Sequence, residues 1–216
     1  MDDIPLGVLT GDIVGSRRIK DAVGLDKALE STLALLETQY AARVDRYRGD
    51  GFQVALHSPA QAMMAAVLTR AALIRHSPSR RETWDARIAV AVGAGDLPET
   101  GRFASANGEV YVRSGQALDA LSEGDTRFAL SFPEPDDTLA LLTRFADAVI
   151  QGWTHNAAEV MYWRLQHAET QKALAERLGR AQSTIHQRLH AARWPLIKEY
   201  LVHVRQRITA VMEAPR

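Results

Sequence analysis

Apolar and polar residues follow two different patterns along this chain, and the change from one to the other divides it in two. In the first part, short β-branched runs bounded by turn residues predict strands at 7–14, 44–47, 52–56, 87–92 and 126–132. Apolar residues at helical spacing predict helices over 25–40, 60–76 and 109–122. The order β-α-β-β-α-β-α-β favours an α+β fold with helices covering one face of a mainly antiparallel sheet.

Residues 133–137, with two prolines and three acids, end the strand pattern. Only helical patterns follow, at 139–150, 157–166, 170–178, 182–192 and 196–212. We therefore predict an α+β domain over residues 1–133, a linker helix within 134–152 and an all-α domain over 153–216.

The charge of the chain is distributed unevenly between these parts. The 216 residues include 26 basic and 26 acidic side chains, and this zero balance argues against a nucleic-acid partner. Residues 1–149, however, hold 16 Lys and Arg against 21 Asp and Glu, whereas residues 150–216 hold 10 against 5. Such an asymmetry indicates two parts with separate functions, the second of which suits a polyanionic partner.

The remaining composition excludes several classes of protein. The chain has no cysteine, which excludes disulfides and thiolate zinc sites. No apolar run approaches the ~20 residues that span a bilayer, and Met1-Asp2-Asp3 is acidic where a signal peptide would be basic. We therefore expect a cytoplasmic protein without a membrane partner.

Two aspartates stand where the predicted topology brings them to one end of the sheet. Asp12 ends the first strand, and Asp50 lies in the predicted hairpin turn. Two carboxylates suit Mg²⁺, which keeps further positions for water and phosphate oxygens. Glycine-rich backbone and nearby cations would bind a nucleotide's phosphates, and the candidates are Gly15, Ser16, Arg17 and Arg46. The alternative is that these are turn residues whose arginines pair with the acids.

Three stretches, Asp12-Ile-Val-Gly-Ser16, Gly49-Asp-Gly-Phe52 and Arg87–Gly95, resemble the core of the class III nucleotidyl cyclases. The resemblance covers about residues 6–123 and implies a ferredoxin-like palm fold. It also implies a metal site formed by Asp12, the Ile13 carbonyl and Asp50, and a head-to-tail dimer. The sequence departs from that family at Asp119 and Glu123, where the family carries Asn and Arg, and acids there have the wrong sign to stabilise a phosphoryl transition state.

Over nearly its full length the chain resembles the SatD family of bacterial proteins. The residues that carry this resemblance are Gly11-Asp-Ile-Val-Gly-Ser-Arg17 and Gly49-Asp-Gly-Phe-Gln53, followed by a helical C-terminal segment. It implies this architecture rather than a particular activity.

Residues 171–189 carry the spacing of a helix-turn-helix, with Ala175, Gly179 and Ile185 at the positions where phage-repressor motifs need a small, a turn and a buried residue. The motif also resembles sigma-factor region 4. Its second helix and flanks offer side chains that bond base edges and phosphates, namely Arg180, Gln182, Ser183, Thr184, His186, Gln187, Arg188 and Arg193. The alternative is a plain helical hairpin that packs on its own chain.

The sequence therefore favours a homodimeric regulator that binds double-stranded DNA, with a palm domain that binds nucleotide and Mg²⁺ or mediates dimerisation. The alternative is an Mg²⁺-dependent nucleotide-processing enzyme with a helical regulatory tail, and a third possibility is a palm domain that serves as a scaffold only.

Overall fold

The computed structural model describes residues 4–47, 49–79, 82–98, 103 and 106–213. Its sheet contains five strands in the order β2-β3-β1-β4-β5. The strands are β1 (Ile4–Ile13), β2 (Arg43–Arg46), β3 (Phe52–Leu56), β4 (Ala86–Gly95) and β5 (Phe128–Ser131). Neighbouring strands are antiparallel except β4 and β5, which are parallel.

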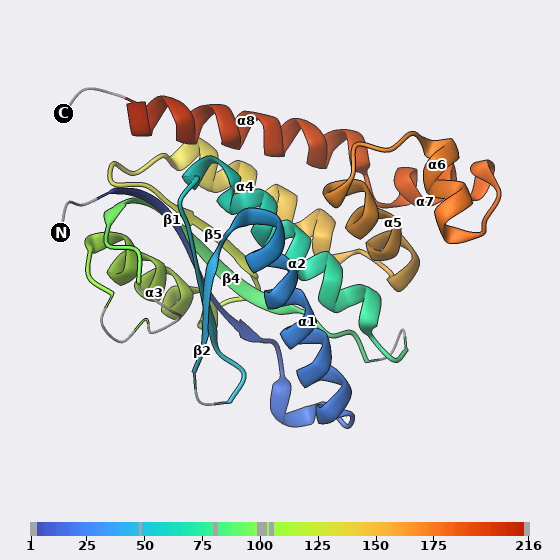
Figure 1. The fold of residues 1–216 in the computed structure, drawn as a ribbon, viewed down its shortest axis with the longest axis horizontal. Helices are drawn as coiled ribbons and strands as arrows, with labels where there is room; N and C mark the ends of the chain where they lie inside the picture. The colour runs from blue at the N-terminus through green and yellow to red at the C-terminus, as the bar shows by residue number, and fades with distance from the viewer. Residues whose placement is uncertain (1–3, 48, 80–81, 99–102, 104–105, 214–216) are drawn as a thin grey trace.

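Helices connect most of these strands and then follow β5 as far as Glu213 (Figure 1). They are α1 (Ala22–Tyr40), α2 (Ala62–His76), α3 (Glu109–Ser122), α4 (Asp137–Gln151), α5 (His155–Gln166), α6 (Gln171–Leu178), α7 (Gln182–Ala191) and α8 (Trp194–Glu213). The strand order of β1 to β4, with α1 and α2 as connections, is that of a ferredoxin-like palm. The predicted α+β palm followed by an all-α segment is confirmed, and the predicted elements match those observed within a few residues at each end.

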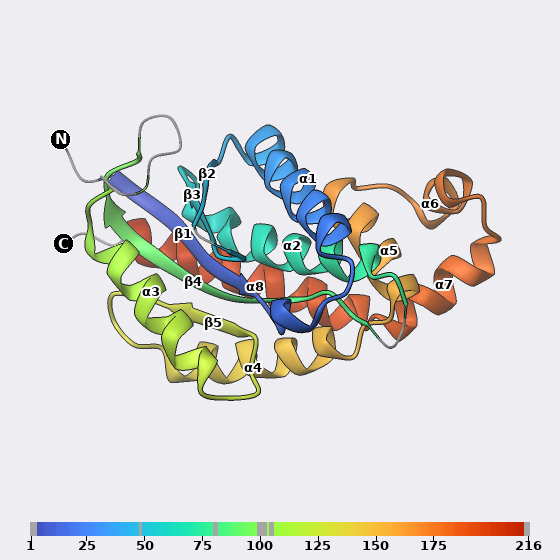
Figure 2. The same cartoon turned by 90° about the horizontal axis from the view of Figure 1, so that it is seen from below.

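The prediction that helices cover one face of the sheet is wrong. Side chains alternate between the two faces of a strand, and β1 uses both of its faces for apolar packing. Leu9 and Ile13 join the cluster beneath α1 and α2, whereas Leu6 and Val8 pack with Val110 of α3 on the opposite face. Figure 2 shows α3 on the side of the sheet away from α1 and α2. The sheet is therefore the middle layer of three.

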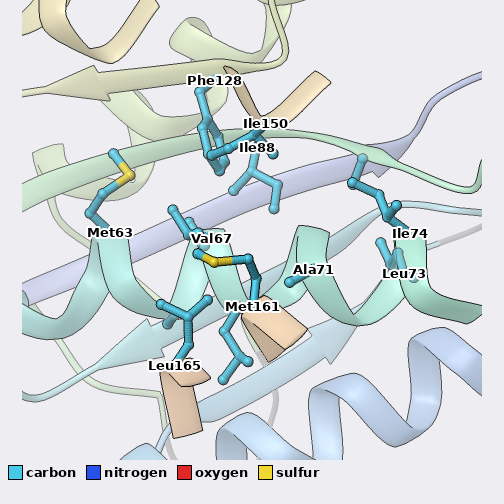
Figure 3. Close-up of a cluster of buried hydrophobic side chains, with 14 of the residues drawn as sticks. Met63, Val67, Ala71, Leu73, Ile74, Ile88, Phe128, Ile150, Met161 and Leu165 are labelled. Carbon is cyan, nitrogen blue, oxygen red and sulfur yellow. The ribbon is translucent and has the colours of Figure 1, made fainter. Parts of the chain in front are cut away.

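Helix α2 lies between the sheet and the C-terminal helices, and it is apolar on nearly every side. Figure 3 shows Val67 and Ala71 of α2 among Ile88 and Phe128 from the sheet and Met161 from α5. A helix that is hydrophobic all round is expected in such a buried layer. One cluster of buried residues thus runs from the sheet into α8. The division into an α+β domain, a linker helix and an all-α domain stays a prediction.

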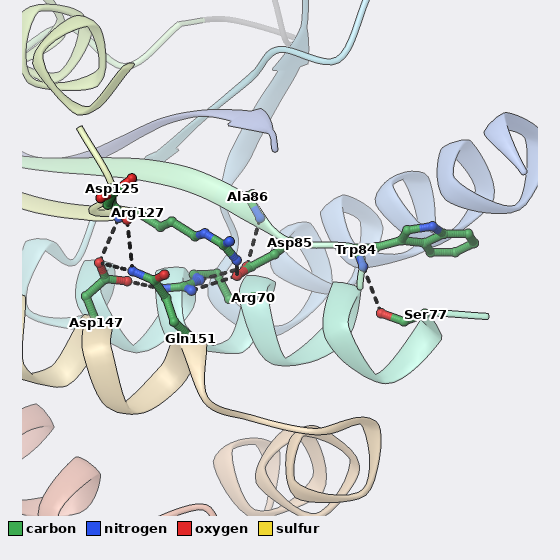
Figure 4. A network of polar contacts seen from close by, with 9 residues as sticks. All are labelled: Arg70, Ser77, Trp84, Asp85, Ala86, Asp125, Arg127, Asp147 and Gln151. Carbon is green, nitrogen blue, oxygen red and sulfur yellow. Dashed lines mark hydrogen bonds and ion pairs between the residues drawn. The ribbon is translucent and has the colours of Figure 1, made fainter. Parts of the chain in front are cut away.

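A buried network of charges joins α2, β4, β5 and α4 (Figure 4). Arg70 of α2 is fully buried and donates to both carboxylate oxygens of Asp85, at 2.8 and 2.7 Å, and to Asp147 of α4 at 2.6 Å. Asp85 also accepts from Arg127 at 2.6 Å, and Asp147 accepts from the Arg127 backbone N–H. This network fixes the start of β4 against the start of β5, which positions the sheet edge described below.

Among the residues that the structure describes, no helix has the length and the hydropathy needed to cross a membrane.

Candidate functional sites at the sheet edge and on the C-terminal helices

Charged residues from four neighbouring segments meet at one end of the sheet. Asp50 lies in the turn between β2 and β3, Asp12 near the end of β1, Arg87 at the start of β4 and Arg127 just before β5. Because these strands are adjacent in the order β3-β1-β4-β5, two acids are followed by two arginines along the edge. The topology thus brings the two predicted aspartates to the same end of the sheet.

Asp12 is paired with Arg87, which the sequence pattern does not indicate as a site residue. Arg87 is its register partner on β4 and donates from Nε to Oδ1 at 2.9 Å and from Nη2 to Oδ2 at 2.5 Å. The hydrogen bond to Asp12, with the negative charges of Asp12 and Asp50, raises the pKa of Arg87. Arg87 is therefore held as a cation close to both acids, and it occupies both oxygens of the Asp12 carboxylate.

The predicted metal ligands lie on two sides of the sheet edge. Ile13 and Asp50 line a pocket of about 550 Å³ against α1, together with Ser16 and Arg46. Asp12 lies on the face of the sheet that α3 covers. Side chains alternate along a strand, so Asp12 shares a face with Thr10, whose hydroxyl lies 2.8 Å from Ser114 Oγ of α3. The structure thus brings Ile13, Ser16, Arg46 and Asp50 together and leaves Asp12 with Arg87.

The predicted phosphate-binding residues are also divided. Arg46 bonds Asp26 of α1 at 2.6 Å at the rim of the α1 pocket. Arg17 is exposed on the short 3-10 helix Ser16–Arg18 and lines neither of the two pockets at this edge. Gly15 has the left-handed conformation that favours glycine (φ 65°) and turns the chain from β1 into that 3-10 helix.

A second, more polar pocket of about 270 Å³ lies beside Gly15. Its lining includes three arginines from three segments, Arg18, Arg87 and Arg127. Sequence reasoning missed Arg87 and Arg127 as site residues because only the strand order brings them next to β1. Arg87 and Arg127 are already paired with Asp12 and Asp85, so an anion at this pocket would share these cations with two carboxylates.

Mg²⁺ fits the donor set at this edge only in part. Two carboxylates and a backbone carbonyl are the hard oxygen ligands that Mg²⁺ prefers. No group of three or more His, Asp or Glu able to hold a metal ion occurs within the described residues, and Arg87 already bonds both Asp12 oxygens. A metal ion at Asp12 would therefore compete with Arg87.

The residues of the predicted helix-turn-helix lie in α6 and α7, at the opposite end of the molecule from the start of β1 and the end of α8 (Figures 1 and 2). Thr170 caps the start of α6, since its Oγ1 accepts from the Ala173 N–H at 3.2 Å. Gly179 ends α6 in the left-handed conformation (φ 59°), with Arg180 N–H bonded to the Ala175 carbonyl and Gly179 N–H to that of Glu176. This is the Schellman arrangement, and it sets the direction in which α7 leaves the turn.

The two helices pack on one another through apolar side chains, and Leu178 of α6 is only partly buried. Leu174 and Ala175 of α6 and Ile185 and Leu189 of α7 are buried. At the end of α7, Trp153 donates from its indole N–H to the Ala192 carbonyl at 3.0 Å. This bond ties the end of α7 to the segment between α4 and α5.

Most of the predicted DNA-contacting residues are exposed. Thr184 is half-buried, and Arg188 is held by Glu159 of α5 at 2.6 Å, so it is less free than its neighbours to reach a base. The others are exposed, namely Arg180, Gln182, Ser183, His186, Gln187 and Arg193. The arrangement offers hydrogen-bond donors and acceptors in the middle of α7, with a cation on either side of it.

No protein-family model and no curated protein sequence matches the chain. Several solved structures resemble it in part. A bacterial light-regulated adenylyl cyclase matches 60% of this chain and 76% of its own, with 12% identity and a TM-score of 0.48. The active GGEEF domain of a diguanylate cyclase from Vibrio cholerae matches 62% of this chain and 85% of its own, with 18% identity and a TM-score of 0.45.

An adenylate/guanylate cyclase/hydrolase from Silicibacter pomeroyi matches 56% of this chain and 72% of its own, with 20% identity and a TM-score of 0.42. At such identities the similarity concerns the fold alone.

Proposed function

We propose that the chain binds double-stranded DNA through α6 and α7 and acts as a regulatory protein of the SatD type. The observation that carries this proposal is the turn at Gly179, which joins two helices that share a buried seam and leaves the polar side of α7 exposed. A recognition helix enters the major groove in this arrangement. The excess of 10 Lys and Arg over 5 Asp and Glu in residues 150–216 favours a polyanionic partner.

Replacing Gln187 by alanine is expected to weaken binding to a preferred duplex about 5- to 150-fold, because a bidentate base contact contributes about 1–3 kcal/mol. Arg180→Ala is expected to weaken all duplexes alike and to lower the slope of affinity against salt by about one unit, since it removes a phosphate contact. The measurement is fluorescence anisotropy with duplexes enriched on the full chain from a random-sequence library.

The matched control is Arg205→Ala, which removes an exposed cation of α8 and should leave both affinities unchanged. Gln187 is a better probe than Arg188, because Arg188→Ala would also break the ion pair with Glu159. An affinity for DNA that does not change with salt concentration contradicts the proposal. An affinity that is the same in Gln187→Ala, in Arg180→Ala and in the parent chain also contradicts it.

The second candidate function is binding of a nucleotide, with or without its turnover, at the sheet edge. The observation that favours it is the pair of pockets that flank Gly15 and Ser16, one with Asp50 and apolar residues of α1, the other with arginines. The apolar side of the α1 pocket suits a base, and the arginines suit phosphates. Where the cyclases carry Asn and Arg, this chain has Asp119 and Glu123, which are exposed at the end of α3. The positive charge near this edge therefore comes from the arginines of the second pocket.

Asp50→Asn is expected to weaken Mg²⁺-dependent binding of ATP or GTP at least about tenfold, because it removes a charged ligand from the pocket that also contains Ser16 and Arg46. Calorimetry with each nucleotide, with and without Mg²⁺, measures this. Glu37→Gln, on the exposed side of α1, is the matched control. Nucleotide binding that is equal in Asp50→Asn and the parent chain places the nucleotide elsewhere.

The same samples test the enzyme alternative. Turnover of any of the four nucleoside triphosphates with Mg²⁺ or Mn²⁺, abolished in Asp50→Asn, supports a nucleotide-processing enzyme. Binding without turnover supports a sensor domain, and the absence of both supports a scaffold.

A further inference from the structure

The exposed polar residues of α7 recur at a spacing that places them on one side of the helix. They are Gln182, Ser183, His186, Gln187 and His190. Each lies three or four positions from another member of the set, which is the spacing of side chains that share a helix face. The structure describes every residue of α7, and this exposed side carries neither arginine nor lysine.

Arg188, the one arginine of α7, is bound to α5 instead. Its side chain is 14% exposed, and its Nη1 donates to Glu159 Oε2 at 2.6 Å. Glu159 also attracts Arg75 of α2, whose guanidinium lies over the Tyr162 ring at 3.6 Å. If Arg188 left this pair to reach a base, a carboxylate that is only 29% exposed would lose its partner at 2.6 Å, which costs free energy. Arg188 is therefore part of the packing of α7 on α5.

The two purines present different groups to a helix in the major groove. Adenine offers the N7 acceptor and the N6 donor, whereas guanine offers two acceptors, N7 and O6. A glutamine amide has one acceptor and one donor group, so it bonds adenine twice, but opposite guanine its oxygen would face O6. Two bonds to guanine need the two donors that arginine supplies, and serine can bond either purine. The exposed side of α7 thus offers the adenine-selecting side chain twice and the guanine-selecting one not at all.

We infer that α7 selects duplexes with adenine at the base pairs that Gln182 and Gln187 contact, and that Arg188 does not read guanine. This inference rests on the proposed binding of DNA through α6 and α7, and it names the class of duplex that the site takes. The sequence pattern places Arg188 among the residues for base contact, and its ion pair with Glu159 removes it from that set. Gln187 is the better probe of the two glutamines, because it lies in the middle of α7 whereas Gln182 is its first residue.

Selection from a random-sequence duplex library, run in parallel with the full chain and with its Gln187→Ala variant, tests the inference. We expect the parent chain to enrich adenine at one base pair where Gln187→Ala has no preference. Replacing that adenine by guanine is expected to raise the dissociation constant of the parent chain about 5- to 150-fold, the discrimination of a bidentate contact. The same replacement should leave the dissociation constant of Gln187→Ala unchanged.

Replacing the adenine by 7-deazaadenine tests the contact without changing the protein. This base lacks the N7 acceptor and keeps the N6 donor, so we expect it to weaken binding of the parent chain and not of Gln187→Ala. Gln187→Arg is expected to move the preference at this base pair to guanine, because it places two donors on the exposed side of α7. The matched control is Gln206→Arg, which adds the same charge at an exposed glutamine of α8 and should leave the base preference unchanged. Circular dichroism confirms that each variant is folded.

Three results overturn the inference and leave DNA binding by α6 and α7 standing. The first is salt-sensitive binding without any base preference, or with preferences that are the same in Gln187→Ala and in the parent chain. The second is guanine at the base pair where Gln187→Ala loses its preference. The third is a guanine preference that Arg188→Gln abolishes, because Arg188 then reads a base in spite of Glu159. A chain that binds no duplex overturns both the inference and the proposed function.

Discussion

Replacing Arg70 by alanine is expected to lower the free energy of unfolding by about 3–5 kcal/mol, the range for breaking a buried ion pair. The guanidinium is fully buried and donates to Asp85 and Asp147, and it also lies over the Phe128 ring at 4.7 Å. Its pKa is raised because these acids outweigh desolvation. Without it, two carboxylates remain in the interior with only Arg127 to balance them. Urea unfolding followed by circular dichroism measures the loss.

The control for Arg70 is Arg46→Ala, which breaks the more exposed pair with Asp26. That change should lower the free energy of unfolding by no more than about 1 kcal/mol. Equal effects of the two substitutions would show that water reaches the carboxylates of Asp85 and Asp147, contrary to their burial. Because the network holds Arg127 and the start of β4, we also expect Arg70→Ala to weaken any anion binding at the sheet edge.

The helices and strands could be predicted because each is encoded locally. The hairpin follows from Gly49-Asp50-Gly51, and both ends of α6 follow from Thr170 and Gly179, whose backbone and capping roles depend only on near neighbours. With the strand order assumed, these elements place Asp12 and Asp50 at one end of the sheet, where the structure has them.

The contacts made between distant residues could not be predicted. Asp12 and Arg87 are 75 positions apart, and only the pairing of β1 with β4 makes them neighbours. Arg70 stands in an apolar helix where sequence reasoning expects an exposed charge, and its two acids come from other elements. The position of α3 on the second face of the sheet also depends on packing, because its pattern of apolar residues fits either face.

Ile185→Asp is expected to weaken DNA binding at least about 100-fold while leaving the sheet edge folded. Ile185 is fully buried in α7, and an uncompensated charge there would melt α6 and α7. Met161 and Leu165 of α5 lie beside α2 (Figure 3), and we expect these contacts to keep α5 folded when α6 and α7 unfold. Hydrogen exchange read by mass spectrometry should show protection lost over 171–191 and kept in α2 and β4.

Gln187→Ala is the matched control, since it removes an exposed side chain of the same helix and should keep all protection. DNA binding retained by Ile185→Asp contradicts the assignment of α7 as the recognition helix. Loss of protection throughout the chain would instead make the helices and the sheet one cooperative unit, as the continuous buried cluster permits. In that case an occupied sheet edge would stabilise α7 directly, and nucleotide and DNA affinities would be coupled through folding.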